Sequence, residues 1–326
     1  MTALIEISDK LKEKLNQLPQ LPGIYKMLDA KGNIIYIGKS KCLKKRVKSY
    51  FVDNPKWEKV KKLVLFIDDI EYVVTDTHLE ALLLECQLIK KIKPSFNALM
   101  KNDQNYVYLK VENYNKFNAL SVVNHREENT FGPFRKRYPL LNIINALKSI
   151  FPLIKKSGSY EFEYHIMPSP MDKDTFNKNK AVLLEIFSDS NHMDILMNAL
   201  GEKMQEAAAE YKFETAAKYR DIIQGLYHIN NGIWRYKDLM SKDILLKIPT
   251  LNGHKLFFIS NGNILAKKLY SNLKNEDIER FVKESYAIKS SISLNTDEKA
   301  DIDFRDVLYS EIISLPQEMV HIISLG

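Results

Sequence analysis

Residues 23–50 constrain the fold more than any other part of the chain. Two short apolar runs, 24–28 and 33–37, are separated by a four-residue gap that contains an Asp and a Gly. Such a gap between β-rich runs favours a β-hairpin. With the gap as a four-residue loop, Tyr25 and Tyr36 would be a cross-strand pair on one face of the sheet. The sequence therefore predicts an antiparallel hairpin that carries two tyrosines side by side.

A helix is predicted directly after the hairpin, over residues 40–51. One face of it would carry Lys39, Leu43, Arg46 and Tyr50. Spacings of four, three and four residues stack these side chains along one side of a helix. Three phenols, an ammonium and a guanidinium are thus gathered in one short stretch. On its own, this pattern also fits a tyrosine-rich hairpin followed by an ordinary basic surface helix.

Positive charge is concentrated in the same part of the chain. The formal net charge is +7, and the segment from Lys26 to Lys62 has 12 Lys or Arg against 3 Asp or Glu. The aromatic residues within and beside this segment are Tyr25, Tyr36, Tyr50, Phe51 and Trp57. Basic residues interleaved with aromatic ones favour a nucleic-acid groove over a merely solvated basic face. The residues expected to contact DNA phosphates are Lys41, Lys44, Lys45 and Lys48.

The tripeptides Gly23-Ile24-Tyr25 and Tyr36-Ile37-Gly38, with Lys39, Arg46 and Tyr50 after them, resemble the GIY-YIG nuclease family in its UvrC version. The resemblance implies a small three-stranded antiparallel sheet with flanking helices over residues 21–100, preceded by a helix within residues 1–20.

The same resemblance implies the catalytic roles. Tyr36 would be the general base for an attacking water, directly or through a metal-bound water. Arg46 would stabilise the phosphorane, and Lys39 would favour the phenolate form of Tyr36, because a free phenol has a pKa near 10. Tyr25 and Tyr50 would position the phosphate or Tyr36.

Glu85 is the candidate metal ligand. Residues 69–75 alternate like a strand, and Thr77 then opens a helix with Glu80 in the capping-box position. From spacing alone, Glu85 could be a surface glutamate paired with lysines. Its surroundings, including Asn97, resemble the UvrC module, where this glutamate is the sole protein ligand of a hydrated divalent metal. The resemblance therefore assigns Mg²⁺ or Mn²⁺ to Glu85, as suits a single carboxylate, and a supporting catalytic role to Asn97.

Residues 191–230 predict two amphipathic helices whose alanine-rich faces pack as a helical hairpin. Periodicity leaves open whether this hairpin simply packs on its own domain. The series resembles the UVR motif, through which UvrC docks on UvrB. The resemblance implies a helical contact with a UvrB-type protein through Phe213, Glu214, Ala217 and Arg220.

Residues 101–190 resemble the connecting region of UvrC, through Phe131-Gly132-Pro133-Phe134 and Phe151-Pro152-Leu153. That region commonly holds a cysteine cluster, but this chain has only Cys42 and Cys86, so we expect no iron–sulfur cluster.

The pattern of residues 231–326 predicts a small α+β region of unknown role. Its predicted strands are 243–248, 254–260 and 263–270, and its predicted helices are 276–286 and 304–313. We interpret Asp301-Ile302-Asp303 as a loop and helix start.

The whole chain is therefore expected to be α+β. No apolar run approaches the roughly 20 residues that span a bilayer, and the N-terminus has no signal-peptide pattern. We expect a cytoplasmic protein without a membrane partner.

The leading hypothesis is a metal-dependent endonuclease of nucleotide excision repair that acts on damaged double-stranded DNA. In UvrC this module makes the incision 3′ to a lesion, and the residues after 231 are too few to hold both the RNase H-like nuclease domain and the helix–hairpin–helix repeats of UvrC. The resemblance therefore implies a single incision, on the 3′ side of the lesion. One alternative is a Cho-like accessory repair nuclease. Another is a catalytically silent DNA-binding adaptor that docks through the UVR motif.

Overall fold

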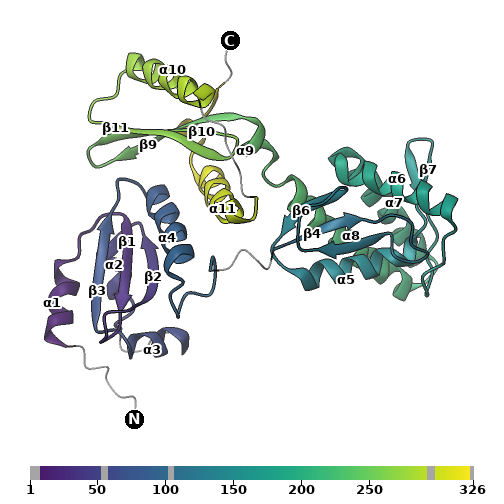
Figure 1. The fold of residues 1–326 in the computed structure, drawn as a ribbon, viewed down its shortest axis with the longest axis horizontal. Coiled ribbons are helices and arrows are strands. Elements are labelled where there is room, and N and C mark those ends of the chain that lie inside the picture. Colours follow the sequence, from purple (N-terminus) through teal and green to yellow (C-terminus); the bar gives the residue numbers. More distant parts are fainter. Residues whose placement is uncertain (1–7, 53–57, 102–105, 292–297, 324–326) are drawn as a thin grey trace. The chain divides into compact units, whose positions relative to one another are not determined.

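The protein is described here from a computed structural model, which covers residues 8–52, 58–101, 106–291 and 298–323 (Figure 1). The chain forms two compact units: residues 1–103 with 238–326, and residues 104–237. The predicted α+β class is confirmed. Trp57, expected among the aromatic residues of the basic segment, lies outside the described residues.

The N-terminal module, residues 8–101, is a three-stranded antiparallel sheet with helices around it. Its strands are β1 (Gly23–Leu28), β2 (Ile34–Ser40) and β3 (Asp69–Val74), in the order β2-β1-β3. Its helices are α1 (Asp9–Gln17), α2 (Leu43–Lys48), α3 (Glu58–Val64) and α4 (His78–Ile92). The predicted start of α4 is confirmed, because the Thr77 side chain accepts a hydrogen bond from the Glu80 amide. The helix ends at the left-handed Lys93, next to Pro94.

The loop of the β1–β2 hairpin is shorter than predicted. The Asp29 amide donates to the Asn33 carbonyl, so the loop comprises residues 30–32, with Gly32 at a φ of 81°. The Asp29 carboxylate also accepts from two amides within this turn. A bulge between Met27 and Leu28 shifts the register once more. The two irregularities together change which residues of the strands face each other.

The predicted pairing of Tyr25 with Tyr36 is therefore wrong. Tyr25 pairs with Gly38, and Tyr36 pairs with Met27. The two tyrosines still share a face, as diagonal neighbours with ring centroids 6.2 Å apart. Gly38 makes this arrangement possible, because a Cβ atom at position 38 would overlap the hydroxyl end of the Tyr25 ring.

The helix after the hairpin also starts later than predicted. Strand β2 continues through Ser40, and α2 is only six residues long. Lys39 is thus a strand residue, and its expected place on the helical face is wrong. Arg46 and Tyr50 keep their predicted relation, since they are hydrogen-bonded four residues apart. The buried side chains of this part include Leu43 and Tyr50, which pack with Tyr25 in the core of the module.

The C-terminal region, residues 238–323, belongs to the same compact unit as the N-terminal module. Its sheet has the order β11-β10-β9-β12, with all pairs antiparallel. The strands are β9 (Asp243–Thr250), β10 (Gly253–Ser260), β11 (Asn263–Tyr270) and β12 (Val320–Ile323). The helices are α9 (Lys237–Ser241), α10 (Asn275–Ser291), α11 (Glu298–Ser314) and the short η2 (Gln317–Met319). Figure 1 shows α10 and α11 on opposite sides of this sheet.

Most of this region follows its sequence pattern. Asn261 and Gly262 have φ values of 48° and 70°, as the predicted two-residue turn between β10 and β11 requires. The interpretation of Asp301-Ile302-Asp303 as a loop and helix start is wrong, because these residues lie inside α11. Asp303 is buried and forms an ion pair with Lys90 of α4 at 2.9 Å.

The second unit joins the connecting region and the predicted helical hairpin. Its strands are β4 (Val107–Val111), β5 (Leu120–Val123), β6 (Thr130–Phe134), β7 (Ile154–Lys156) and β8 (Ser159–Glu161). Its helices are α5 (Arg137–Leu147), η1 (Lys148–Ile150), α6 (Lys173–Ser188), α7 (Ser190–Ala209) and α8 (Phe213–Trp234). One cluster of buried side chains runs from Val107 to Ile229. The α7–α8 hairpin therefore packs on its own unit through one side and presents its other side to solvent.

The contact between Tyr25 and Gly38 can be tested by substitution. Gly38→Ala forces the Tyr25 ring to move, and we expect it to lower the free energy of unfolding by about 1–3 kcal/mol. Gly201→Ala is the matched control, because a Cβ there meets no atom within 4 Å. Urea denaturation of both variants measures the difference. Equal stability of the two variants would contradict the packing argument.

Candidate active site

Three tyrosines of the N-terminal module form one cluster. The ring centroids of Tyr25, Tyr36 and Tyr50 lie 5.9–6.2 Å apart. The hydroxyl oxygens of Tyr25 and Tyr50 are 2.7 Å apart, and the Tyr50 hydroxyl donates to that of Tyr36 over a long 3.4 Å. The structure thus brings together the three phenols that the sequence analysis predicted, although the register between β1 and β2 differs from the predicted one.

Arg46 sets the direction of the hydrogen bonds in this cluster. Its Nη2 donates to the Tyr50 hydroxyl at 3.1 Å, and its guanidinium carbon lies 4.9 Å from the centroid of the Tyr50 ring. A tyrosine hydroxyl has one hydrogen to donate and can accept two hydrogen bonds. With Arg46 and Tyr25 both donating to Tyr50, the hydrogen of Tyr50 is directed to Tyr36. The Tyr36 oxygen therefore accepts the last of a series of hydrogen bonds that begins at the Arg46 guanidinium.

Glu85 of α4 lies beside this cluster. Its Oε1 accepts the backbone N–H of Lys39 at 3.1 Å. Burial raises the pKa of Glu85 to about 7, against the opposing charges of Lys39 and Arg46. Burial also raises the pKa of Tyr36 well above its ordinary value, and the neighbouring Tyr50 and Glu85 add to this increase. The buried carboxylate is costly to ionise in the protein alone, so the site favours an additional positive charge.

The donor set around Glu85 fits a hydrated divalent cation. Among the described residues, Glu85 forms no ion pair. No group of three or more His, Cys, Asp or Glu side chains converges on one point in the described part of the chain. A cation at Glu85 would therefore keep most of its ligands as water or substrate oxygens, which is the usual preference of Mg²⁺.

Asn97 braces the strand that carries Tyr36. Its Oδ1 accepts the Ile37 amide at 2.9 Å, and its Nδ2 donates to the Ile37 carbonyl at 2.8 Å. These bonds occupy the open edge of β2, the outer strand of the sheet. Asn97 thus fixes the backbone between Tyr36 and Gly38, which is a supporting position and not a contact with the phenol cluster.

Lys39 contacts the histidine at the start of α4. Its Nζ lies 3.2 Å from Nε2 of His78, and Nδ1 of His78 lies 3.3 Å from Oε1 of Glu311. Sequence reasoning missed both of these residues. His78 could have been noticed as the first residue of α4, next to its cap. No spacing in the sequence connects it to Glu311, 233 residues further along.

The four lysines expected to contact DNA fall into two pairs. Lys44 and Lys48 donate to the backbone and side-chain oxygens of Asn16 at 2.9 and 2.8 Å, and so tie α2 to α1. Lys41 and Lys45 are exposed, and neither forms an ion pair with a described residue. The second pair is therefore the better placed for phosphate contacts.

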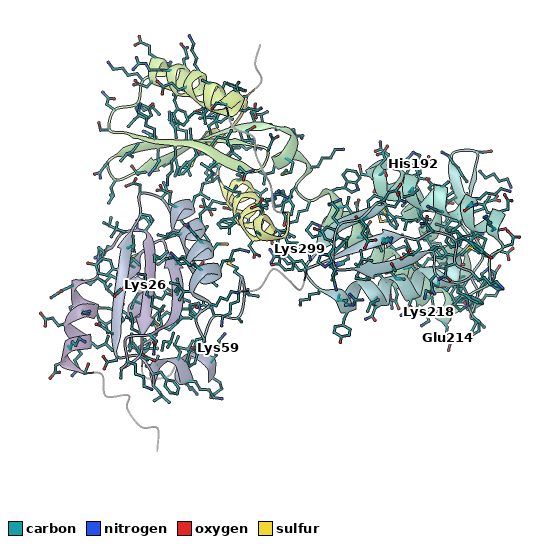
Figure 2. The ribbon with its side chains drawn as sticks, viewed as in Figure 1. Lys26, Lys59, His192, Glu214, Lys218 and Lys299 are labelled. Carbon is teal, nitrogen blue, oxygen red and sulfur yellow. The ribbon has the colours of Figure 1, made fainter. Side chains whose placement is uncertain are left out.

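The α7–α8 hairpin presents two aromatic rings where its helices meet. Tyr211 and Phe213 are 82% and 64% exposed, and their ring centroids lie 6.2 Å apart. Of the other predicted contact residues, Ala217 is half-buried, while Glu214 and Arg220 are exposed. Glu214 and Lys218 lie at the edge of the unit, with their side chains outward (Figure 2). An exposed aromatic pair with charged neighbours is typical of a protein-binding surface.

Comparison with known proteins identifies two families along the chain. Residues 21–98 match the model of the UvrC-like GIY-YIG domain, and residues 194–229 match the UvrB/uvrC motif, UVR. The chain is 32% identical to UvrABC system protein C of Caldanaerobacter subterraneus subsp. tengcongensis, over 91% of this chain and 52% of the relative. It is 32% identical to the same protein of Streptococcus pyogenes, over 87% and 50%. The chain thus spans about half the length of the curated relatives that it matches.

A solved structure resembles the N-terminal module in sequence. It is the GIY-YIG N-terminal endonuclease domain of UvrC from Thermotoga maritima, bound to its catalytic divalent cation, magnesium. It is 39% identical, covers 28% of this chain and 100% of that one, and has a TM-score of 0.27.

Among the described residues, none of the helices has both the length and the apolar character needed to cross a membrane.

The raised pKa of Glu85 predicts a stability effect in the protein without metal. The pKa of its carboxyl is about 7 in the folded state against an ordinary 4.5. Ionised Glu85 therefore destabilises the fold fully above pH 7, by on the order of 3 kcal/mol, and not at all below pH 4.5. We expect Glu85→Gln, which can still accept the Lys39 amide, to raise the melting temperature at pH 8 in the presence of a chelator.

The difference between wild type and Glu85→Gln should shrink as the pH falls from 7 towards 4.5. Thermal melts at a series of pH values measure it. Gln87→Glu on the exposed side of the same helix is the control, because a carboxylate there stays in water. A difference that is independent of pH would contradict the assignment of the raised pKa to Glu85.

Proposed function

Because this chain carries a UvrC-like GIY-YIG domain and a UVR motif, we propose that it is a metal-dependent DNA endonuclease of nucleotide excision repair. One observation carries the proposal: the Glu85 carboxylate, which forms no ion pair with any described residue, lies beside the hydrogen bonds that connect Arg46, Tyr50 and Tyr36. A carboxylate that can hold a cation, a guanidinium and a phenol at one site would together supply what phosphodiester hydrolysis requires.

Glu85 would hold the metal, Mg²⁺ or Mn²⁺. The burial that raises its pKa also excludes water, which strengthens its attraction for a cation. A bound cation would offset the Glu85 charge and stabilise the negative charge that develops on the scissile phosphate. The relative from Thermotoga maritima was crystallised with magnesium as its catalytic cation. We propose the same class of ion here.

The protein's own groups would handle the proton and the phosphate. In its phenolate form, Tyr36 would accept a proton from the attacking water at its phenol oxygen. Burial and the neighbouring Tyr50 raise the pKa of Tyr36, so the phenolate would need the positive charge of Arg46 and of a cation held at Glu85. Arg46 is exposed on one side and anchored on Tyr50 on the other, so it can face a phosphate without losing its position. Asn97 keeps the Tyr36 backbone fixed during the reaction.

The substrate would be double-stranded DNA that contains a lesion. Lys41 and Lys45 would contact its phosphates, since Lys44 and Lys48 already bond to Asn16. We propose one incision by this site, on the 3′ side of the lesion, as the resemblance to UvrC implies. We propose that the protein acts in the cytoplasm.

The UVR hairpin would bind a UvrB-type protein. Tyr211 and Phe213 are the most exposed large apolar side chains of this hairpin; Glu214 follows Phe213, and the exposed Arg220 lies about two turns further along α8. Aromatic and arginine side chains contribute most to protein–protein affinity. Recruitment through this surface would bring the nuclease to a lesion that the partner has already bound.

Loss of the phenol or of the metal ligand should stop cutting. We expect Tyr36→Phe to lower the nicking rate by about 10²–10⁴-fold, since it removes the proton acceptor. Glu85→Ala should have an effect of similar size, because it removes the metal ligand. The measurement is gel analysis of a lesion-bearing duplex labelled on either strand end, with Mg²⁺ and a UvrB-type protein.

Tyr138→Phe is the control for the tyrosine substitution, because Tyr138 is 80% exposed and distant in sequence from the site. DNA affinity should be unchanged in both site variants. Cleavage that survives both substitutions would exclude the proposed mechanism. Tight DNA binding without any cleavage by the wild-type protein would instead favour an adaptor.

The partner surface has a separate prediction. Phe213→Ala should weaken binding to a UvrB-type protein by at least about tenfold, because truncation of a central aromatic anchor typically costs 2 kcal/mol or more. Tyr138→Ala removes another exposed aromatic side chain of the same unit and should not change the affinity. Isothermal titration calorimetry compares the two. Equal affinities would show that the partner uses another surface.

A further inference from the structure

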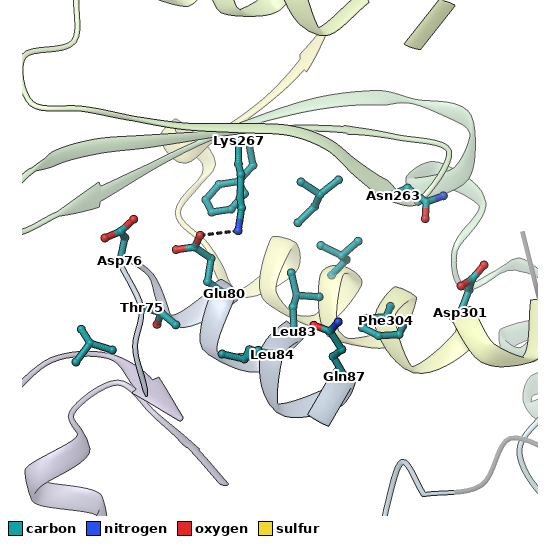
Figure 3. Close-up of a pocket in the computed structure, with 15 residues that line it drawn as sticks. Thr75, Asp76, Glu80, Leu83, Leu84, Gln87, Asn263, Lys267, Asp301 and Phe304 are labelled. Carbon is teal, nitrogen blue, oxygen red and sulfur yellow. Dashed lines mark hydrogen bonds and ion pairs between the residues drawn. The ribbon is translucent and has the colours of Figure 1, made fainter. Parts of the chain in front are cut away.

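The C-terminal region contacts the N-terminal module at helix α4, which carries Glu85. Oε1 of Glu80, in the first turn of α4, accepts hydrogen bonds from Lys255 at 2.7 Å and from Lys267 at 3.0 Å (Figure 3). Lys90, near the other end of α4, pairs with the buried Asp303 of α11. These ion pairs join the first turn of α4 to the sheet of the C-terminal region and its other end to α11.

A third contact reaches the candidate active site itself. Nζ of Lys39 lies 3.2 Å from Nε2 of His78, and Nδ1 of His78 lies 3.3 Å from Oε1 of Glu311 in α11. The side chains of His78 and Glu311 are only 15% and 12% exposed. Hydrogen bonds between groups that are mostly shielded from water are stronger than those on a surface. This relay connects the C-terminal region to a residue that is next to Gly38.

The donors and acceptors of the relay define its arrangement. A lysine ammonium can only donate, so Nε2 of His78 must accept and cannot carry a hydrogen. The hydrogen of the neutral ring is then on Nδ1, from which it is donated to Glu311. Lys41 also lies near Glu311, and with His78 and Lys39 it lowers the pKa of the Glu311 carboxyl. Glu311 is thus an ionised acceptor that fixes the tautomer of His78.

We propose that Glu311 is a positioning residue for Lys39 and acts through His78. This rests on the proposed nuclease function. The lysine side chain has four rotatable bonds, and without a partner its ammonium would sample many positions. The relay holds the ammonium on His78, while the backbone amide of the same Lys39 donates to the Glu85 carboxylate. The C-terminal region would therefore complete the active site by fixing one positive charge beside the metal ligand and the phosphate.

Substitutions of Glu311 test the relay by nicking kinetics. We expect Glu311→Ala to lower kcat by about tenfold with little change in KM for DNA, because a misplaced catalytic group costs rate. Glu311→Gln keeps an acceptor for the Nδ1 hydrogen and should restore most of the rate. In a Lys39→Ala background, Glu311→Ala should have no further effect. An undiminished kcat in Glu311→Ala, or a full additional loss in that background, would overturn the proposal.

A matched control separates positioning from docking. Lys267→Ala removes another ion pair between the C-terminal region and α4 but leaves the relay intact. It should keep the wild-type kcat. A loss equal to that of Glu311→Ala would mean that general docking of the region matters and the relay does not, which would also overturn the proposal.

A second readout needs no activity. Long-range proton–nitrogen NMR distinguishes the two tautomers of a histidine ring, and His78→Gln assigns the signal. We expect His78 to carry its hydrogen on Nδ1 in the full chain and to lose this preference in Glu311→Ala but not in Lys267→Ala. An Nε2–H tautomer in the wild type would overturn the proposal. If the wild type cuts no DNA while the tautomer is as expected, the nuclease function fails and the relay stands.

Discussion

The candidate site depends on the contact between the Tyr25 ring and Gly38. Because position 38 has no side chain, the ring of Tyr25 lies across β2 and its hydroxyl reaches Tyr50, 2.7 Å away. That hydrogen bond joins the hairpin to the chain after α2. Arg46 and Tyr36 are then placed by their bonds to the same Tyr50 hydroxyl. One absent methyl group thus determines where the guanidinium and the second phenol lie.

Local signals in the sequence were sufficient for the elements but not for their register. The Thr77 cap, the strand at 69–74 and the Asn261-Gly262 turn each depend on neighbouring residues, and all three are as predicted. The hairpin loop was wrong by one residue, since an Asp and a Gly fit loops of three or four residues equally well. No residue pattern in the sequence indicates the bulge between Met27 and Leu28. Both errors preserve the shared face of Tyr25 and Tyr36, so the phenol cluster was still predictable.

Long-range contacts explain what the sequence could not supply. The spacing of Lys39 to Arg46 is helical and so predicts a helical position for Lys39. The strand, however, continues through Ser40, whose hydroxyl donates to the Cys42 carbonyl and accepts the Cys42 amide. The ammonium of Lys39 meets His78 and, through it, Glu311 from the other end of the chain. Similarly, nothing in the lysine run distinguishes the two residues that bond to Asn16. Such partners depend on tertiary packing and not on periodicity.

Helix α4 brings these observations together. Glu80 lies in its first turn, where a carboxylate is favoured by the helix dipole; its amide donates to the Thr77 cap, and its carboxylate accepts hydrogen bonds from Lys255 and Lys267. Burial acts to raise the pKa of Glu80, but Lys255 and Lys267 outweigh it and the pKa is lowered; at Glu85, five residues on, burial raises the pKa against the charges of Lys39 and Arg46. The same helix thus holds one carboxylate that is paired with two lysines and one buried carboxylate that forms no ion pair with a described residue. The ion pairs at its two ends keep the buried carboxylate in place, and in this way a region remote in sequence can support the candidate site.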